Sequence, residues 1–161
     1  MIIGATVGLD LVANTFAGPG VIRDAPQVGL LGGFRDRLGP AWGWRYEVLV
    51  RAGDQRAWDA VLRHRTTQAT LVVEAETRIH DIQALLRRTA SKREAAGGVR
   101  VVLLVAATRR NREAIAAARE LLDAEFPCPV RTALRSLASG LCPDRDALIV
   151  QGSRRAQSSH D

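Results

Sequence analysis

The stretch that decides the fold runs from residue 57 to residue 86 and reads "AWDAVLRHRTTQATLVVEAETRIHDIQALL". It contains two apolar runs, "AWDAVLRH" and "TLVVEAE", separated by the polar turn "RTTQA", and this pattern predicts a β-hairpin. Apolar residues then recur at helical spacing, which predicts a helix from Arg78 to Ala96. The stretch therefore predicts strand, turn, strand and helix in that order.

The flanking sequence extends this hairpin into a mixed sheet. "WGWRYEVLV" (Trp42 to Val50) alternates and predicts a preceding strand, and Val99 to Thr108 has the continuous apolar character of a strand covered on both faces. The other predicted elements are a strand within 5–16, helices at 24–38, from Thr108 to about Glu125 and around 132–139, and a strand at 146–150. The predicted fold is α/β: a mixed sheet with an antiparallel meander, a right-handed crossover helix and helices on both faces.

Composition limits the class of protein. The 161 residues suit a single domain, which we place at 1–150 with a polar tail at 151–161, and 47% hydrophobic with 25% charged residues is ordinary for a soluble globular protein. No apolar run approaches the length of a membrane span, so we expect no membrane partner. Two cysteines without metal-ligand spacing or a signal peptide favour a cytoplasmic location.

The charge balance makes a nucleic acid a candidate partner. Lys and Arg total 23 against 17 Asp and Glu, a net charge of +6, and Lys92 is the only lysine. The planar guanidinium of arginine suits phosphate. An arginine-rich genome would produce the same excess, so composition alone leaves both explanations open.

Three carboxylates mark a candidate site on the hairpin. If the turn centres on Thr66 and Thr67, the numbers of cross-strand partners sum to 133, so Asp59 lies opposite Glu74 with Cβ atoms roughly 5 Å apart. Glu76 shares the face of Glu74 by the two-residue period of a strand. Because like charges repel, such a cluster needs a cation or a proton, and oxygen ligands favour Mg²⁺ or Mn²⁺.

Two further interpretations of this cluster depend on its neighbours. Glu47 extends it if the preceding strand pairs in register. Alternatively, the three acids occupy a solvated strand end and are neutralised by Arg56, Arg63 or Arg78, because structural ion networks also contain such clusters.

With these residues in place, the pattern resembles the restriction-endonuclease-like (PD-(D/E)xK) superfamily. Its motif is an Asp on the second meander strand and an acid-x-Lys on the third; Asp59 and Glu74 match, with fourteen residues between them. Glu76 stands where the lysine is usual, as in some restriction enzymes, and Gln83 resembles a glutamine of the exonuclease branch. The resemblance implies a metal held by Asp59 and Glu74, with the Ala75 carbonyl, in a family where many members with altered motifs are inactive.

The same resemblance implies roles for a metal-dependent nuclease. Asp59, Glu74 and Glu76 would be the catalytic residues, and Glu76 would take the proton from the attacking water. A nearby basic residue, Arg78, His80 or Lys92, would replace the usual lysine in neutralising phosphate charge.

A resemblance over nearly the whole chain points to a regulator. "GLDLV", "WRYEVLV", "GDQRAWDAVL", "VEAETRIHDIQALLRR" and "LLVAATRRNREAI" together look like the C-terminal region of actinobacterial helix-turn-helix (Xre-type) transcriptional regulators. In those proteins a DNA-binding helical domain precedes this region, whereas here Met1 falls just before "GLDL", as expected for a stand-alone or truncated member or a start assigned too late. The resemblance implies a DNA-associated regulatory domain with little or no turnover. The alternatives are a Mg²⁺-dependent nuclease and a dimerisation or ligand-sensing module, and a homodimer would fit the last.

Two basic groups are further candidates for binding phosphate. His80, Gln83 and Arg87 follow at three- and four-residue steps and share a helix face, which suits either phosphate binding or simple solvation. The other group occupies the first turn of the helix after Thr108. Cations there are unfavourable without an anion, so we expect nucleic-acid backbone contact from this group together with Arg87. Its members are Arg109, Arg110 and Arg112.

Overall fold

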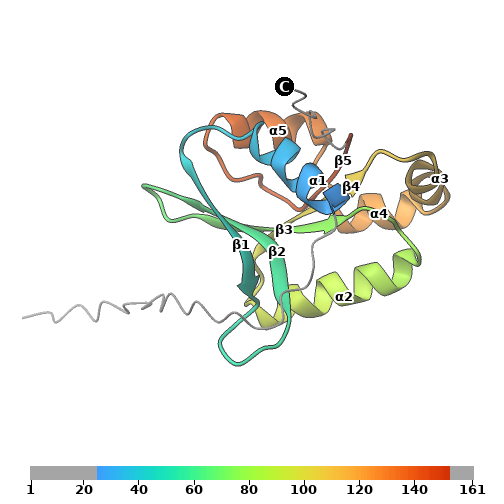
Figure 1. Ribbon diagram of the computed structural model, residues 1–161, viewed down its shortest axis with the longest axis horizontal. Helices are drawn as coiled ribbons and strands as arrows, with labels where there is room; N and C mark the ends of the chain where they lie inside the picture. Colours follow the sequence, from blue (N-terminus) through green and yellow to red (C-terminus); the bar gives the residue numbers. More distant parts are fainter. Residues whose placement is uncertain (1–24, 153–161) are drawn as a thin grey trace, which may run out of the picture.

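Over residues 25–152, which the computed structural model describes, the chain forms a five-stranded mixed sheet with five helices (Figure 1). The predicted strand within 5–16 and the tail beyond residue 152 lie outside the described residues. In chain order the elements are α1 (Ala25–Arg35), β1 (Trp42–Leu49), β2 (Ala57–His64), β3 (Thr70–Glu76), α2 (Ile82–Ala95), β4 (Arg100–Ala106), α3 (Arg109–Ala117), α4 (Arg119–Glu125), α5 (Val130–Ala138) and β5 (Ala147–Gln151).

The sheet has the strand order β1-β2-β3-β4-β5. Strands β1, β2 and β3 pair antiparallel, whereas β3, β4 and β5 pair parallel, with α2 as the crossover between β3 and β4. The predicted meander, crossover and mixed sheet are therefore present. The central strands carry continuous runs of buried residues, because helices cover both faces of the sheet there.

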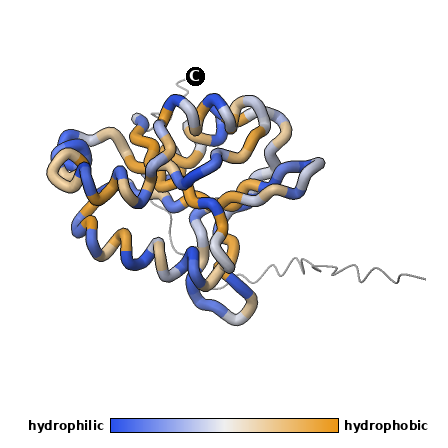
Figure 2. The backbone as a smooth tube through the Cα atoms, turned by 180° about the vertical axis from the view of Figure 1, so that it is seen from behind, coloured by the Kyte–Doolittle hydropathy of each residue, from blue (hydrophilic) through white to orange (hydrophobic). Residues whose placement is uncertain are grey.

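The helices divide into two layers, one on each face of the sheet (Figure 1). The first core cluster packs Leu30, Phe34 and Leu137 of α1 and α5 against one face, and the second packs Leu85 and Ile115 of α2 and α3 against the other. Figure 2 shows the hydrophobic residues concentrated on the central strands, while the helices alternate in colour, as amphipathic elements on a core do.

Three predicted boundaries were wrong. Helix α2 begins at Ile82 instead of Arg78, because Asp81 caps it: its Oδ1 accepts a hydrogen bond from the Ala84 N–H at 3.0 Å. The long helix expected after Thr108 is two helices, since Ala118 (φ −115°, ψ 24°) leaves the helical conformation between α3 and α4. Gln151, expected in the tail, is the buried last residue of β5.

None of the helices in the described part of the chain combines the length and the apolar character that crossing a membrane requires.

Candidate functional site

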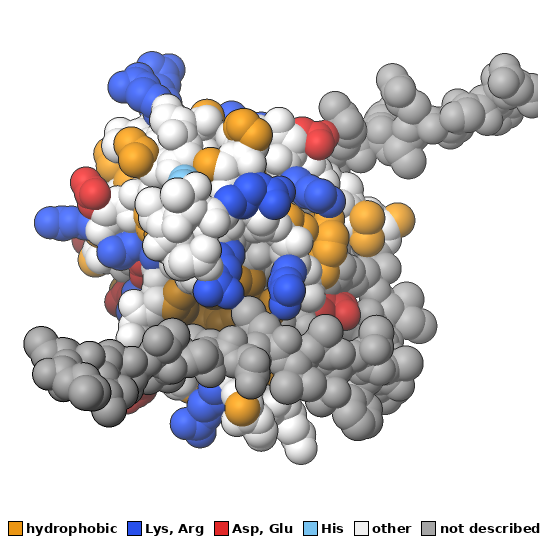
Figure 3. Space-filling view, turned by 90° about the vertical axis from the view of Figure 1, so that its left-hand side faces the viewer, with side chains coloured by type: hydrophobic (Ala, Val, Ile, Leu, Met, Phe, Trp, Pro, Cys, Tyr) orange, Lys and Arg blue, Asp and Glu red, His pale blue; other side chains and the backbone are white. Residues whose placement is uncertain are grey.

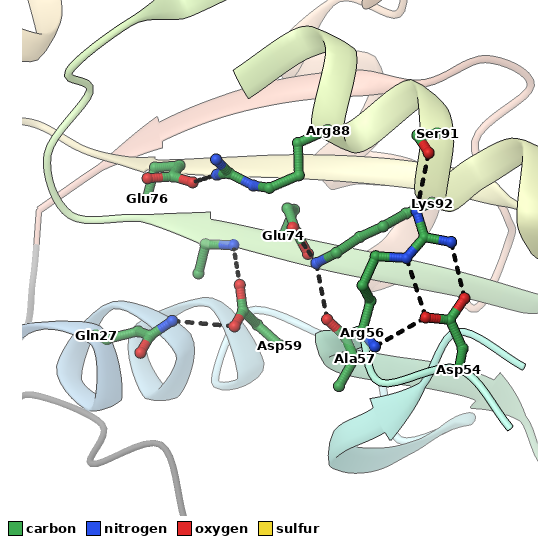
Figure 4. A network of polar contacts seen from close by, with 11 residues as sticks. Gln27, Asp54, Arg56, Ala57, Asp59, Glu74, Glu76, Arg88, Ser91 and Lys92 are labelled. Carbon is green, nitrogen blue, oxygen red and sulfur yellow. Dashed lines mark hydrogen bonds and ion pairs between the residues drawn. The ribbon is translucent and has the colours of Figure 1, made fainter. Parts of the chain in front are cut away.

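The hairpin has the predicted register. Ala60 pairs with Val73 and Leu62 with Leu71, so partner numbers sum to 133, and Asp59 lies one residue beyond the paired stretch, beside Glu74. The Asp59 side chain, however, turns to other partners (Figure 4). Its Oδ2 accepts a hydrogen bond from the Ala75 N–H at 2.7 Å, and its Oδ1 accepts one from Gln27 of α1 at 3.1 Å.

Glu74 is buried at 3% exposure and pairs with the only lysine of the chain. Lys92 reaches from α2 to place its Nζ 2.5 Å from Glu74 Oε1. The same Nζ donates to the Ala57 carbonyl at 2.8 Å and lies 5.3 Å from the centre of the Trp58 ring, close enough for a cation–π contact. The ammonium is thus held in place by three elements, α2, β2 and β3.

Glu76 forms a second ion pair with α2, through Arg88 (Figure 4). The two ion pairs lie side by side because α2 runs along β3 and the residue spacings of the two elements match. Two residues of a strand advance roughly 6.6 Å, and four residues of a helix advance about 6 Å. Glu74 and Glu76 therefore meet Lys92 and Arg88, which are four residues apart. Together these four residues form an acid–base ladder between β3 and α2.

Burial determines the protonation behaviour of the ladder. Desolvation raises the pKa of Glu74 from 4.5 to about 7; the Lys92 charge opposes this rise, and the Asp59 charge adds to it. Burial also raises the pKa of Glu76, against the lowering effect of Arg88. Within residues 25–152 the buried Glu74 Oε2 has no hydrogen-bond partner, so this carboxyl lies where a proton or a cation is favoured.

The donor set fits a hard cation only in part. Asp59 and Glu74 supply oxygen ligands of the kind that Mg²⁺ takes, and among residues 25–152 no group donates a hydrogen bond to Glu74 Oε2. However, any metal at Glu74 would compete with Lys92 Nζ for the same carboxylate. Within residues 25–152, no three or more His, Cys, Asp and Glu side chains come together in a group that suits a metal ion.

The predicted supporting residues lie around the cluster, on β1, on the loop after β3 and on α2. Glu47 sits between the pairs Tyr46↔Ala60 and Val48↔Trp58, which places it across from Asp59, but it is exposed and its φ of 50° interrupts β1. Arg78, His80 and Gln83 are exposed, and within the described residues their side chains form no hydrogen bond or ion pair.

The predicted phosphate-binding arginines are exposed on two helices. Arg87 lies on α2, and Arg110 and Arg112 lie on α3. Arg109 pairs with Glu113 at 2.8 Å within α3. The N-terminus of α3 is capped by Thr108, whose hydroxyl accepts a hydrogen bond from the Asn111 N–H at 3.1 Å.

Several residues of the network were not predicted. Arg88 is the partner of Glu76, although only its neighbour Arg87 was singled out, and Gln27 was missed as a partner of Asp59. The alternative that named Arg56, Arg63 or Arg78 chose the wrong cations, since Arg56 binds Asp54 and Ser91 instead. The four-residue step on the helix, matched to the two-residue step on the strand, is the signal that would have identified the ladder.

No protein-family model matches the chain, and searches of curated proteins and of solved structures return no significant match.

Proposed function

We propose that this domain has a restriction-endonuclease-like topology, associates with DNA in a regulatory context, and acts through protein or nucleic-acid contacts more than through turnover. The element order, a helix followed by a three-strand meander, a crossover helix and a parallel strand, supports the topology. The resemblance to the C-terminal region of Xre-type regulators supports the regulatory context. The net charge of +6 supports an anionic partner.

The observation that carries the proposal is the position of Lys92 Nζ, 2.5 Å from Glu74 Oε1. Asp, Glu and Lys are the residue types of a nuclease site, and here the cation comes from α2 instead of the strand. Because this ammonium already neutralises the central carboxylate, the cluster is stable without a metal. A carboxylate engaged in this way is a weak metal ligand, which favours low turnover.

Binding and turnover are tested on the same purified protein. We expect duplex or single-stranded DNA to bind with an affinity that falls steeply as salt rises, and plasmid incubated with Mg²⁺ to remain intact. A flat salt response would instead favour the dimerisation or ligand-sensing module, in which DNA plays no part.

A metal-dependent nuclease is the second candidate. The buried Glu74 Oε2, which has no hydrogen-bond partner in the described part of the chain, favours it. In that case Mn²⁺ would bind the wild type and produce calorimetric heats that Asp59→Ala loses, and plasmid cleavage would disappear in Glu74→Gln. Equal heats in wild type and Asp59→Ala would exclude Asp59 as a ligand. Cleavage that persists in Glu74→Gln would come from a contaminant.

A further inference from the structure

One end of the sheet, away from the acid–base ladder, carries a basic groove. Strands β1 and β2 and the turn after β2 line a hollow of about 920 Å³, near the upper end of the roughly 300–1,000 Å³ typical of small-molecule pockets. Figure 3 faces this end of the molecule and shows Lys and Arg side chains gathered around exposed hydrophobic side chains. Among the residues that line the groove are Arg35, Trp44, Arg45, Arg63, His64 and Arg65.

The register of β1 and β2 brings two of these arginines together. Arg45 pairs with Val61, and Arg63 pairs with Gly43, so the two arginines are diagonal neighbours on one face of the sheet. Diagonal Cβ atoms in an antiparallel pair are roughly 7–8 Å apart, within reach of a single extended anion. Gly43 has no side chain, which keeps the surface between them open.

Arginines give the described lining of the groove a net positive charge. No Asp or Glu is among the described residues that line it. Arg35, Arg45 and Arg63 form no ion pair within residues 25–152, whereas seven other arginines, among them Arg56, Arg88 and Arg100, do. Like charges focused in a concave surface raise the local potential and attract an anion.

The floor of the groove is apolar. Val48 and Val61 contribute to its lining. The Trp44 ring belongs to the opposite face of the sheet from Arg45, where it packs against Phe34 of α1 with ring centres 6.2 Å apart. Arginines around an apolar floor suit a ligand that presents phosphates on one side and flat, weakly polar faces on the other.

We propose that this groove binds single-stranded nucleic acid, with its phosphates on the arginines and its bases against the apolar floor. Single strands bind proteins through basic grooves that follow the backbone, and their unpaired bases can lie against apolar side chains, whereas a duplex keeps its bases stacked away from such a floor. The proposal rests on the DNA-associated function put forward above and identifies both the surface and the form of nucleic acid.

Fluorescence anisotropy with labelled single-stranded and duplex oligonucleotides of equal length and composition tests the proposal. The test variant is Arg45→Glu/Arg63→Glu. Arg110→Glu/Arg112→Glu tests the rival basic surface on α3, and the matched control is Arg131→Glu/Arg135→Glu, which makes the same charge change at exposed positions of α5. We expect the groove variant to lose at least about tenfold in single-strand affinity and to show a shallower salt dependence, and the control to lose less than about threefold. The substituted arginines are exposed, so all three variants should fold, and circular dichroism checks this. The milder Arg45→Gln should show a smaller loss in the same direction.

The outcomes separate this proposal from the proposed function. If the wild type binds DNA and only the α3 variant weakens it, the groove proposal is wrong and the DNA-associated function stands. Tighter binding of the duplex, with the groove and α3 variants equally affected, would also overturn the groove proposal. No binding of either oligonucleotide by the wild type would overturn both. A wild-type dimer in sedimentation that Arg45→Glu/Arg63→Glu dissociates would show that the groove holds a second copy of the chain, and would overturn the proposal as well.

Discussion

At the scale of single residues, Glu74 controls how stability depends on pH. The pKa of its carboxyl is about 7 in the folded protein against an ordinary value of 4.5, so between these values the folded state binds more protons than the unfolded state. The contribution of Glu74 to the free energy of unfolding is therefore greatest below about pH 4.5 and is lost as the pH rises through 7.

We expect Glu74→Gln to remove most of this pH dependence, because the amide does not titrate. Urea unfolding at intervals between pH 4.5 and 8 measures it, with Glu113→Gln on the exposed surface of α3 as the control that should keep the wild-type slope. The difference between wild type and Glu74→Gln should amount to a few kcal/mol across this window, since each unit of pKa corresponds to about 1.4 kcal/mol. Parallel curves for the two proteins would mean that Glu74 is not the titrating group.

Lys92 and Glu74 should behave as one energetic unit. Lys92→Met leaves a buried carboxylate uncompensated, and we expect it to cost about 3–5 kcal/mol at pH 8 and less at pH 5, where Glu74 is protonated. Adding Glu74→Gln to Lys92→Met should restore much of the lost stability, because no buried charge then remains.

A double-mutant cycle over the wild type, both single variants and the double variant measures this coupling by urea unfolding. Additive losses would show that the 2.5 Å contact contributes nothing specific to stability.

At the scale of elements, the sequence predicted the strands and turns that local residue patterns determine. It did not predict the side-chain partners that tertiary packing determines. Strands β2 and β3 and their register followed from alternation and a polar turn, so the neighbourhood of Asp59 and Glu74 could be predicted. The partners of the acids could not, because the rotation of α2 over the sheet, which selects Arg88 over Arg87, is set by core packing. The break at Ala118, which divides the predicted long helix into α3 and α4, likewise has no sequence signal such as Gly or Pro.

Asn111 joins three elements whose connection no sequence pattern predicts. It is fully buried; its Oδ1 accepts from the Ile79 N–H at 2.9 Å, and its Nδ2 donates to the carbonyls of Thr77 and Ala106 at 3.0 and 2.9 Å. The amide thereby fixes the loop between β3 and α2, and so the position of the acid–base ladder, against the start of α3.

We expect Asn111→Ala to destabilise the fold by about 2–4 kcal/mol, because it leaves buried backbone groups without partners. Hydrogen exchange at the Ile79 amide should accelerate beyond the change in global stability. Arg112→Ala, an exposed position on the same helix, should change the unfolding free energy by less than about 0.5 kcal/mol. Unchanged protection at Ile79 would contradict the bracing role of Asn111.

At the scale of the whole molecule, the residues proposed to bind nucleic acid and the ion pairs that stabilise the fold lie on different parts of one sheet. The acid–base ladder stabilises the layer between β3 and α2, whereas the basic groove lies over β1 and β2, where arginines are exposed and have no ion pairs within the described residues. Ligand binding at the groove should therefore raise global stability without altering the titration of Glu74.

This separation leads to a prediction for thermal unfolding. A ligand that binds only the folded state and is present at 100 times its Kd adds about 2.7 kcal/mol, so saturating single-stranded DNA should raise Tm by about 5–10 °C for a chain of this size. The shift should shrink as salt rises, because phosphate contacts release counterions. Arg45→Glu/Arg63→Glu should lose the shift, while Glu74→Gln should keep it, because Glu74 belongs to the ladder and not to the groove. Differential scanning calorimetry with and without the oligonucleotide measures the shift in Tm. A shift that Glu74→Gln loses and Arg45→Glu/Arg63→Glu keeps would place binding at the acid cluster instead.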